Sequence, residues 1–281
     1  MKIEMVSIAV TCGLIFSACS TDDNNTTGSS TQTTCLTSSF SSDVPAWISD
    51  NFTCIQASVS GSNYQIKSND IPNHNSYYFG SSDSRYEDVP SGNSGNPNSI
   101  GEQNYIYTIP ATPSLKEGNA GTTSEMGSCG VAANGVSVFN NQAAGNDSLA
   151  EELATMDAYY GHPDNQKRYH YHSDPTYLTS TQGKFVVGIM LDGFPIYGAK
   201  EKDGSDPTYV TACSHSNALT TENCQPYNNV GNFHCHTGSD NPHSAATIGQ
   251  CHYHLKLDTD LNAKIINYGA YGGTVGSYTN N

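Results

Sequence analysis

Histidine recurs in this chain at a spacing that suits metal ligation. Three His-x-His pairs occur: His170/His172, His234/His236 and His252/His254. Ten histidines placed at random among 281 residues would give only about 0.4 such pairs. Because residues i and i+2 of a β-strand point to the same face, each pair can present two imidazoles side by side. Neutral imidazole is a ligand that both copper and zinc accept, so the spacing predicts a transition-metal site.

Two of these pairs stand in the most strand-like context. Residues 169–172 read YHYH and residues 251–254 read CHYH, so the histidines of each stretch share one strand face. We expect the two stretches to lie close together and to share one copper or zinc ion, with His162 brought back by a turn at Pro163. His74 is a lone additional candidate. The predicted metal ligands are His74, His162, His170, His172, His252 and His254.

The residues alone leave three classes of function open. The first is a metal-binding domain, and the second is a metal-dependent enzyme, either a zinc hydrolase with a bound water or a copper oxidase with a nearby tyrosine. Tyr197 is a candidate proton donor near the site, although core packing is the favoured interpretation for it. The third is a structural or adhesive surface protein whose histidines only hydrogen-bond to the scaffold. Asp157 and Asp192 are candidate metal ligands or acceptors that orient a histidine, although Asp192 also suits a turn. The pair His234/His236 ranks below the other two, because its stretch can equally be a loop beside a disulfide.

The elements that must position these histidines are mostly strands. The stretches NYQIKS and NYIYTIP alternate, and Phe185–Leu191 is a continuous apolar run that predicts a buried strand. Asp192-Gly193 predicts a hairpin turn, after which the chain returns through Ala199. One short helix of about ten residues is expected after Asn146 or Asp147. We predict an all-β or β-rich, sandwich-like single domain with long loops and at most one or two short helices.

The N-terminus predicts export. Residues 1–18 combine a lysine with an apolar run that is too short to span a bilayer, as in a signal peptide. The tetrapeptide FSAC resembles a bacterial lipobox, so we expect Cys19 to carry a lipid and to begin the mature chain. The alternative is an ordinary cleaved signal. Residues 19–44 are expected to be a disordered polar tether, and residues 45–281 the folded domain, anchored in the cell envelope on its periplasmic or surface-exposed side.

Charge and cysteine content limit the possible binding partners and indicate the redox compartment of the chain. The net charge is −15 with only 11 Lys+Arg, so nucleic acid is excluded as a partner and membrane contact is expected only through the lipid. Cysteines in an exported chain predict disulfides. Short separations favour Cys35–Cys54, Cys213–Cys224 and Cys235–Cys251, although sequence alone does not fix connectivity. Cys129 is then the candidate for the unpaired thiol.

Two longer stretches resemble a known family. The segment GHPDNQKRYHYHSDP, followed by GIMLDGFPIYGAKEKDG, is similar to the bacterial YHYH-domain lipoproteins. The similarity extends upstream through SNDIPNHN and downstream to CHYHLKL, and so covers roughly residues 60–272. It matches family motifs at His74, His162, His170, His172, His252 and His254. No activity is established for the family, so the resemblance implies a domain identity and not a reaction.

Overall fold

The fold is rich in β-structure, as the sequence predicts. The computed structural model describes residues 33–144, 148–237 and 251–281. In this part of the chain two main sheets share one hydrophobic core, and the helices are short. None of the helices described there has the length and hydropathy of a membrane span. The predicted signal peptide and Cys19 lie outside the described residues.

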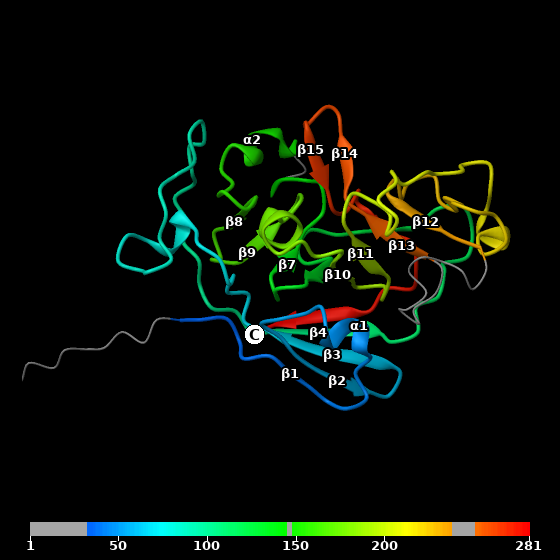
Figure 1. The fold of residues 1–281 in the computed structure, drawn as a ribbon, viewed down its shortest axis with the longest axis horizontal. Coiled ribbons are helices and arrows are strands. Elements are labelled where there is room, and N and C mark those ends of the chain that lie inside the picture. The colour runs from blue at the N-terminus through cyan, green and yellow to red at the C-terminus, as the bar shows by residue number, and fades with distance from the viewer. Residues whose placement is uncertain (1–32, 145–147, 238–250) are drawn as a thin grey trace, which may run out of the picture. The chain divides into compact units, whose positions relative to one another are not determined.

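The smaller sheet forms the lower layer in Figure 1. Its order is β1-β2-β3-β4-β17, with β1 parallel to β2 and the other neighbours antiparallel. The strands are β1 (Ser39–Phe40), β2 (Gln56–Ser60), β3 (Asn63–Ser68), β4 (Tyr105–Pro110) and β17 (Ser277–Asn280). The two alternating stretches of the sequence thus form neighbouring strands. Their apolar faces bury Ile66, Tyr105 and Tyr107 completely.

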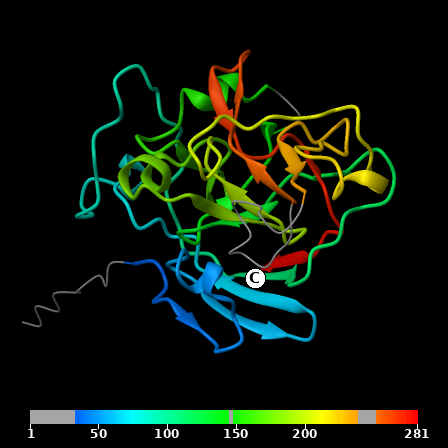
Figure 2. The same cartoon turned by 45° about the vertical axis from the view of Figure 1, so that its right-hand side comes forward.

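The larger sheet carries the histidine pairs. Its order is β12-β13-β11-β10-β6-β7-β9-β8, with parallel pairing only between β11 and β13 and between β7 and β9. The strands in that order are β12 (Phe233–Cys235), β13 (Cys251–His254), β11 (Pro195–Tyr197), β10 (Val186–Met190), β6 (Gly130–Ala132), β7 (Ser137–Val138), β9 (Tyr169–Tyr171) and β8 (Gly161–Pro163). Figures 1 and 2 show β12 and β8 at opposite ends of this layer.

Two small ribbons and several short helices complete the described part of the chain. The ribbons pair β5 (Thr122–Thr123) with β16 (Ala270–Tyr271) and β14 (Lys256–Asp258) with β15 (Ala263–Ile265). The helical elements are α1 (Ala46–Ser49), η1 (Tyr77–Phe79), α2 (Leu149–Leu153), η3 (Tyr177–Thr181) and η4 (His215–Asn217). Long connections therefore separate the strands, as expected.

The predicted helix exists but is shorter than expected. Its proposed caps, Asn146 and Asp147, lie outside the described residues, and the hydroxyl of Ser148 accepts from the backbone N–H of Ala150 at 3.2 Å instead. The backbone N–H of Thr155 bonds to the carbonyl three residues before it, which tightens the chain and ends the helix. α2 therefore spans five residues.

The predicted hairpin is confirmed. β10 and β11 are antiparallel, and Met190 donates its N–H to the carbonyl of Phe194. Gly193 donates to the carbonyl of Met190 and has a φ of +86°, so the turn needs a residue that tolerates the left-handed region. A three-residue loop that includes Asp192 and Gly193 closes the hairpin.

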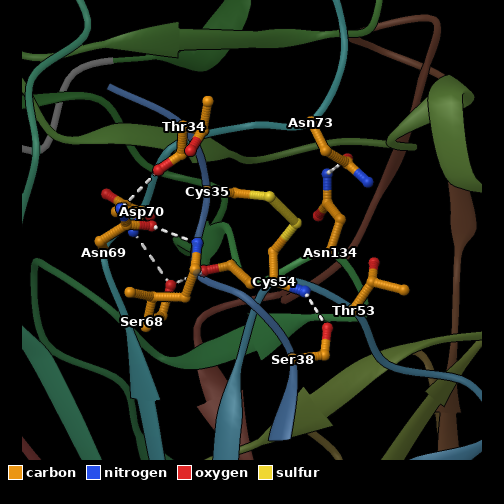
Figure 3. The surroundings of a disulfide bond; sticks show 12 residues. Thr34, Cys35, Ser38, Thr53, Cys54, Ser68, Asn69, Asp70, Asn73 and Asn134 are labelled. Carbon is orange, nitrogen blue, oxygen red and sulfur yellow. Dashed lines mark hydrogen bonds between the residues drawn. A yellow bond between two sulfur atoms is a disulfide. The ribbon is translucent and has the colours of Figure 1, made fainter. Parts of the chain in front are cut away.

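The N-terminal boundary of the fold lies earlier than predicted. Residues 33–44 were expected in the tether, yet β1 pairs with β2 and Cys35 forms a disulfide with Cys54. Figure 3 shows this disulfide beside Asn69, whose side-chain amide donates to the carbonyl of Thr34 at 2.8 Å. These long-range links order a segment whose composition alone predicts disorder. The other two predicted disulfides, Cys213–Cys224 and Cys235–Cys251, are also present, and Cys129 is a buried free thiol.

Candidate metal centres

A tight hairpin presents the YHYH histidines on one face. β8 and β9 are antiparallel, with His162 directly opposite His170. The connection, residues 164–168, is closed by Asp164, whose Oδ1 accepts from the backbone N–H of Arg168 at 3.0 Å. All three histidines of this hairpin are buried, as the same-face argument requires: His162, His170 and His172.

Backbone carbonyls fix the tautomers of His170 and His172. His170 Nδ1 lies 2.9 Å from the carbonyl oxygen of Arg168, and His172 Nδ1 lies 2.5 Å from that of Asn140. A carbonyl can only accept, so each Nδ1 carries the proton that it donates. In the neutral ring, Nε2 is then left with a lone pair and no proton.

The tautomer of His162 follows from two consecutive hydrogen bonds through Thr155. Its Nδ1 lies 2.6 Å from Thr155 Oγ1, and that hydroxyl donates its single proton to the carbonyl of Glu152 at 2.8 Å. Thr155 Oγ1 must therefore accept from His162 Nδ1, which again leaves a lone pair on Nε2. The contact between His162 Nε2 and Glu152 Oε2, at 3.2 Å, then joins two acceptors.

These three residues, His162, His170 and His172, make up what we call the first centre. One nitrogen of each lies within 4.8 Å of the others, and the Nε2 atoms of His170 and His172 are 3.0 Å apart. Two nitrogens bound tetrahedrally to one zinc ion at ~2.05 Å would be about 3.3 Å apart. Lone pairs at this separation repel unless a cation lies between them, so the geometry suits a metal ion.

A proton is a poor substitute for that cation. Burial lowers the pKa of His162 to about 3 and the pKa of His172 to about 4. Burial and the two neighbouring imidazoles lower the pKa of His170 well below its usual value. At neutral pH the three rings are therefore uncharged, which is also the form that binds metals.

The first centre opens into a cavity. Its volume is about 580 Å³, and all three histidines line it together with Glu152, Asn96 and Arg168. Phe139 forms part of the wall and stacks on His170 with ring centroids 4.0 Å apart. A bound ion would thus have three protein nitrogens and a side that a small ligand can reach.

A second cluster lies at the other end of the larger sheet. β12 and β13 are antiparallel, with His234 directly opposite His252. The second centre, as we define it, consists of Glu201, His234, His252 and His254, which are at most 7 % exposed. His252 Nε2 lies 2.8 Å from His234 Nε2 and 3.1 Å from His254 Nε2. Glu201 Oε1 lies 3.3 Å from His234 Nε2 and 3.4 Å from His254 Nε2.

His236 also lies beside this cluster, and one of its nitrogens is within 4.8 Å of a ligand atom of each of Glu201, His234 and His252. Its Nδ1 lies 2.5 Å from Glu222 Oε1, and its Nε2 lies 3.7 Å from Oε2, the other oxygen of Glu201. Burial lowers the pKa of His236, but the two carboxylates outweigh this and raise it overall. His236 therefore lies between the carboxylates of Glu222 and Glu201 and is a further candidate nitrogen at the edge of the second centre.

Comparison with known proteins decides the family. A family model described as "YHYH protein" matches residues 106–263, which is more than half of the 281-residue chain. The chain belongs to the YHYH protein family. No curated protein and no solved structure matches it. Both centres of this YHYH domain lie within the matched residues, whereas His74 lies outside them.

The YHYH domain does not bring its two predicted stretches to one ion. Four strands, β11, β10, β6 and β7, lie between β13 and β9. Five strand spacings amount to roughly 24 Å, far beyond the reach of one coordination sphere. The prediction of a shared ion is therefore wrong. The histidines group with neighbours on adjacent strands, and these form two separate clusters.

His74 is not brought to either cluster. Its Nδ1 lies 2.8 Å from the carbonyl oxygen of Asn75, and its Nε2 lies 2.7 Å from the hydroxyl of Tyr171. Tyr171 faces away from the histidines of its own strand, so His74 packs on the opposite side of β9. Both of its nitrogens are occupied there, and the prediction that His74 is a ligand is not supported.

Asp157 and Asp192 hydrogen-bond to tyrosines, on the strand face opposite the histidines. Asp157 Oδ2 accepts from the hydroxyl of Tyr169, and Asp192 Oδ2 accepts from that of Tyr253, each at 2.6 Å. Their expected role as ligands or as partners of histidine is therefore wrong. Burial raises the pKa of Asp192 to about 6. Tyr197 is buried and stacks on Phe185, and its ring also lies edge-on to His252 with centroids 4.9 Å apart, so it packs in the core beside the second centre.

Sequence reasoning missed the acidic members of the clusters and misjudged one histidine pair. The sequence ranks the pair His234/His236 below the other two, yet His234 faces His252 across two paired strands. Glu201 and Glu152 carry no local spacing signal, since neither stands near a histidine pair in sequence. The one available signal for Glu201 was its place in GIMLDGFPIYGAKEKDG, the stretch that resembles the family.

Proposed function

We propose that this YHYH domain binds a transition-metal ion, copper or zinc, at the first centre. The observation that carries the proposal is the 3.0 Å separation of two Nε2 atoms whose rings both donate their Nδ1 protons to carbonyls. The third imidazole, His162, completes a set of three neutral nitrogens. Nitrogen ligands of this kind suit copper and zinc better than calcium or magnesium, which prefer oxygen.

Metal analysis of the purified, untagged domain tests this proposal. After dialysis and loading with zinc or copper, His170→Ala should weaken binding at the first centre at least about tenfold, because it removes one of three ligands. His215→Ala is the matched control, since His215 lies in η4 outside both centres. Equal affinity in His170→Ala and His215→Ala would contradict metal binding at this centre.

A metal-dependent hydrolase is the second candidate function. It is favoured by the cavity over the first centre and by the three-histidine ligand set, which leaves a coordination position for water. Glu152 lines the cavity and could accept a proton from that water; burial raises the pKa of its carboxyl group. The test is turnover of simple esters and phosphoesters by the zinc-loaded domain. Glu152→Gln should retain the ion and lose any turnover, and a wild type inert to all of them would remove this candidate.

We further propose that the domain is exported and lipid-anchored through Cys19. The support is in the sequence: a short apolar run, the FSAC tetrapeptide and the polar residues after it. The three disulfides in the described residues fit an oxidising compartment. Mass spectrometry of the native N-terminus should give a diacylated Cys19, and cleavage at any other residue would contradict the anchor.

A further inference from the structure

We propose that the second centre is an independent, closed metal site that holds a structural zinc ion. It differs from the first centre in its ligand set, three imidazoles with one carboxylate, and in having four protein ligands instead of three. Four protein ligands around zinc are typical of structural sites, and three are typical of catalytic ones. The proposal does not depend on the first centre.

Potential ligand atoms of four residues converge in the space of the second centre. His234 Nδ1 donates to the carbonyl of Thr208 at 2.8 Å, and His254 Nδ1 donates to that of Gly198 at 2.7 Å. When each ring carries a single proton on Nδ1, its Nε2 is left with a lone pair. His252 Nε2 can carry one proton at most and can direct it to only one of these two neighbours. The Glu201 carboxylate adds an oxygen to the same space, 3.3 Å from His234 Nε2 and 3.4 Å from His254 Nε2.

The distances match one ion bound by all four residues. Neighbouring ligand atoms are 2.8 to 3.4 Å apart. A tetrahedral zinc ion with ligands at ~2.05 Å requires about 3.3 Å between them. His236 and Glu222 extend the arrangement, because His236 Nε2 lies 3.7 Å from Glu201 Oε2 and its Nδ1 lies 2.5 Å from Glu222 Oε1. Such outer contacts commonly hold a ligating carboxylate in place.

The ion would fasten a long irregular segment to the sheet. Residues 198–232 join β11 to β12, and their regular structure consists of the three-residue turn η4. Connections of this length are uncommon in compact domains unless they are functional or cross-linked. Glu201 and the carbonyl of Thr208 belong to this segment, whereas His234 and His252 belong to the sheet. A zinc ion would therefore join the two, beside the disulfide Cys213–Cys224.

The disulfide Cys235–Cys251 holds the ligands of the second centre in register. Each cysteine immediately precedes or follows a ligand, and Cys235 lies directly opposite Cys251, just as His234 lies opposite His252. Removing the cross-link should let β12 and β13 shift and so weaken zinc at the second centre. The first centre, at the other end of the sheet, should not respond.

Zinc stoichiometry in matched variants tests the proposal on the metal-stripped, reloaded domain. We expect two equivalents in the wild type, one in His170→Ala, one in His252→Ala, none in the double variant and two in the control His215→Ala. Glu201→Gln keeps the side-chain shape and should weaken one equivalent at least about tenfold. If near-UV circular dichroism shows that His252→Ala is unfolded, Glu201→Gln alone decides whether the second centre binds zinc.

The outcomes separate the two centres. If Glu201→Gln and the folded His252→Ala retain both equivalents at wild-type affinity, the second centre does not bind zinc. If His170→Ala retains its count while His252→Ala loses one, the proposed function fails and the second centre stands. The double variant Cys235→Ala/Cys251→Ala should bind one of its two zinc equivalents more weakly. The control Cys35→Ala/Cys54→Ala should bind both with wild-type affinity. Equal affinities in these two variants would overturn the role of the disulfide.

Discussion

At the scale of single residues, both centres rest on one device. A backbone carbonyl or a hydroxyl accepts a hydrogen bond from the Nδ1–H of a histidine, which leaves the Nε2 lone pair facing its neighbours. The same contact fixes the ring orientation, so the imidazoles are positioned before any ion arrives. Pre-organisation of this kind lowers the entropy lost on binding and raises affinity.

Thr155 offers a clean test of this device. Thr155→Val keeps the side-chain shape but removes the oxygen that accepts from His162 Nδ1. We expect metal affinity at the first centre to fall about 10- to 100-fold, as for other partners of ligating histidines. Thr155→Ser retains the hydroxyl and should bind nearly as the wild type does. Competition titration against a chelator measures the difference, and equal affinities in Val and Ser variants would contradict the role of Thr155.

The residue scale also marks a limit of prediction from sequence. The His-x-His spacing correctly placed His170 with His172, and His252 with His254, because the period of a strand is local. Glu152 lies in α2 and Glu201 in the connection after β11, and the carbonyl partners of His172 and His234 also come from distant parts of the chain. Their contacts depend on tertiary structure, and no local pattern reports them.

At the scale of elements, the strands were easier to predict than their order. The β10–β11 hairpin was predictable because a buried apolar run, a turn pair and a return strand are contiguous in sequence. The separation of β9 from β13 was not, since it depends on how β6 and β7 insert between distant segments. That insertion is what divides the histidines into two centres.

The hairpin should be sensitive to loss of core volume. Leu191 is 4 % exposed, next to the turn that ends β10. Leu191→Ala removes buried methyl groups and leaves a cavity, so we expect a loss of ~2–5 kcal/mol in the free energy of unfolding. Urea denaturation measures this loss. A change below ~0.5 kcal/mol, which is typical of surface positions, would mean that Leu191 is not packed in the core.

At the scale of the whole molecule, buried neutral histidines couple stability to pH. Burial lowers the pKa of His162 and His234 to about 3 and that of His172 to about 4, against an ordinary value near 6.5. The unfolded chain therefore binds protons below about pH 6.5 that the folded chain does not. This stability is fully present above about pH 6.5 and is lost as the pH falls.

Two buried carboxyl groups, Asp70 and Asp192, act in the opposite direction, but they are outnumbered because burial also lowers the pKa of a fourth histidine, His170. Burial raises the pKa of Asp192 to about 6, so the folded chain binds a proton that the unfolded chain lacks between about pH 4 and pH 6. With each group contributing up to ~1.4 kcal/mol per pH unit, we expect a net loss of ~2–3 kcal/mol per unit between pH 6 and pH 5. Urea unfolding of the chelator-treated domain at pH 7.5, 6 and 5 measures it. Stability that stays level or rises toward pH 5 would contradict this prediction.

The central claim is that the histidines of the YHYH stretch hold a metal ion together with His162. Anomalous diffraction from crystals soaked in zinc or copper, recorded at the absorption edge of each metal, tests it most directly. We predict a peak about 2.0–2.1 Å from the Nε2 atoms of His162, His170 and His172. Ordered imidazoles at this position with no anomalous peak after saturation with either metal would contradict the claim.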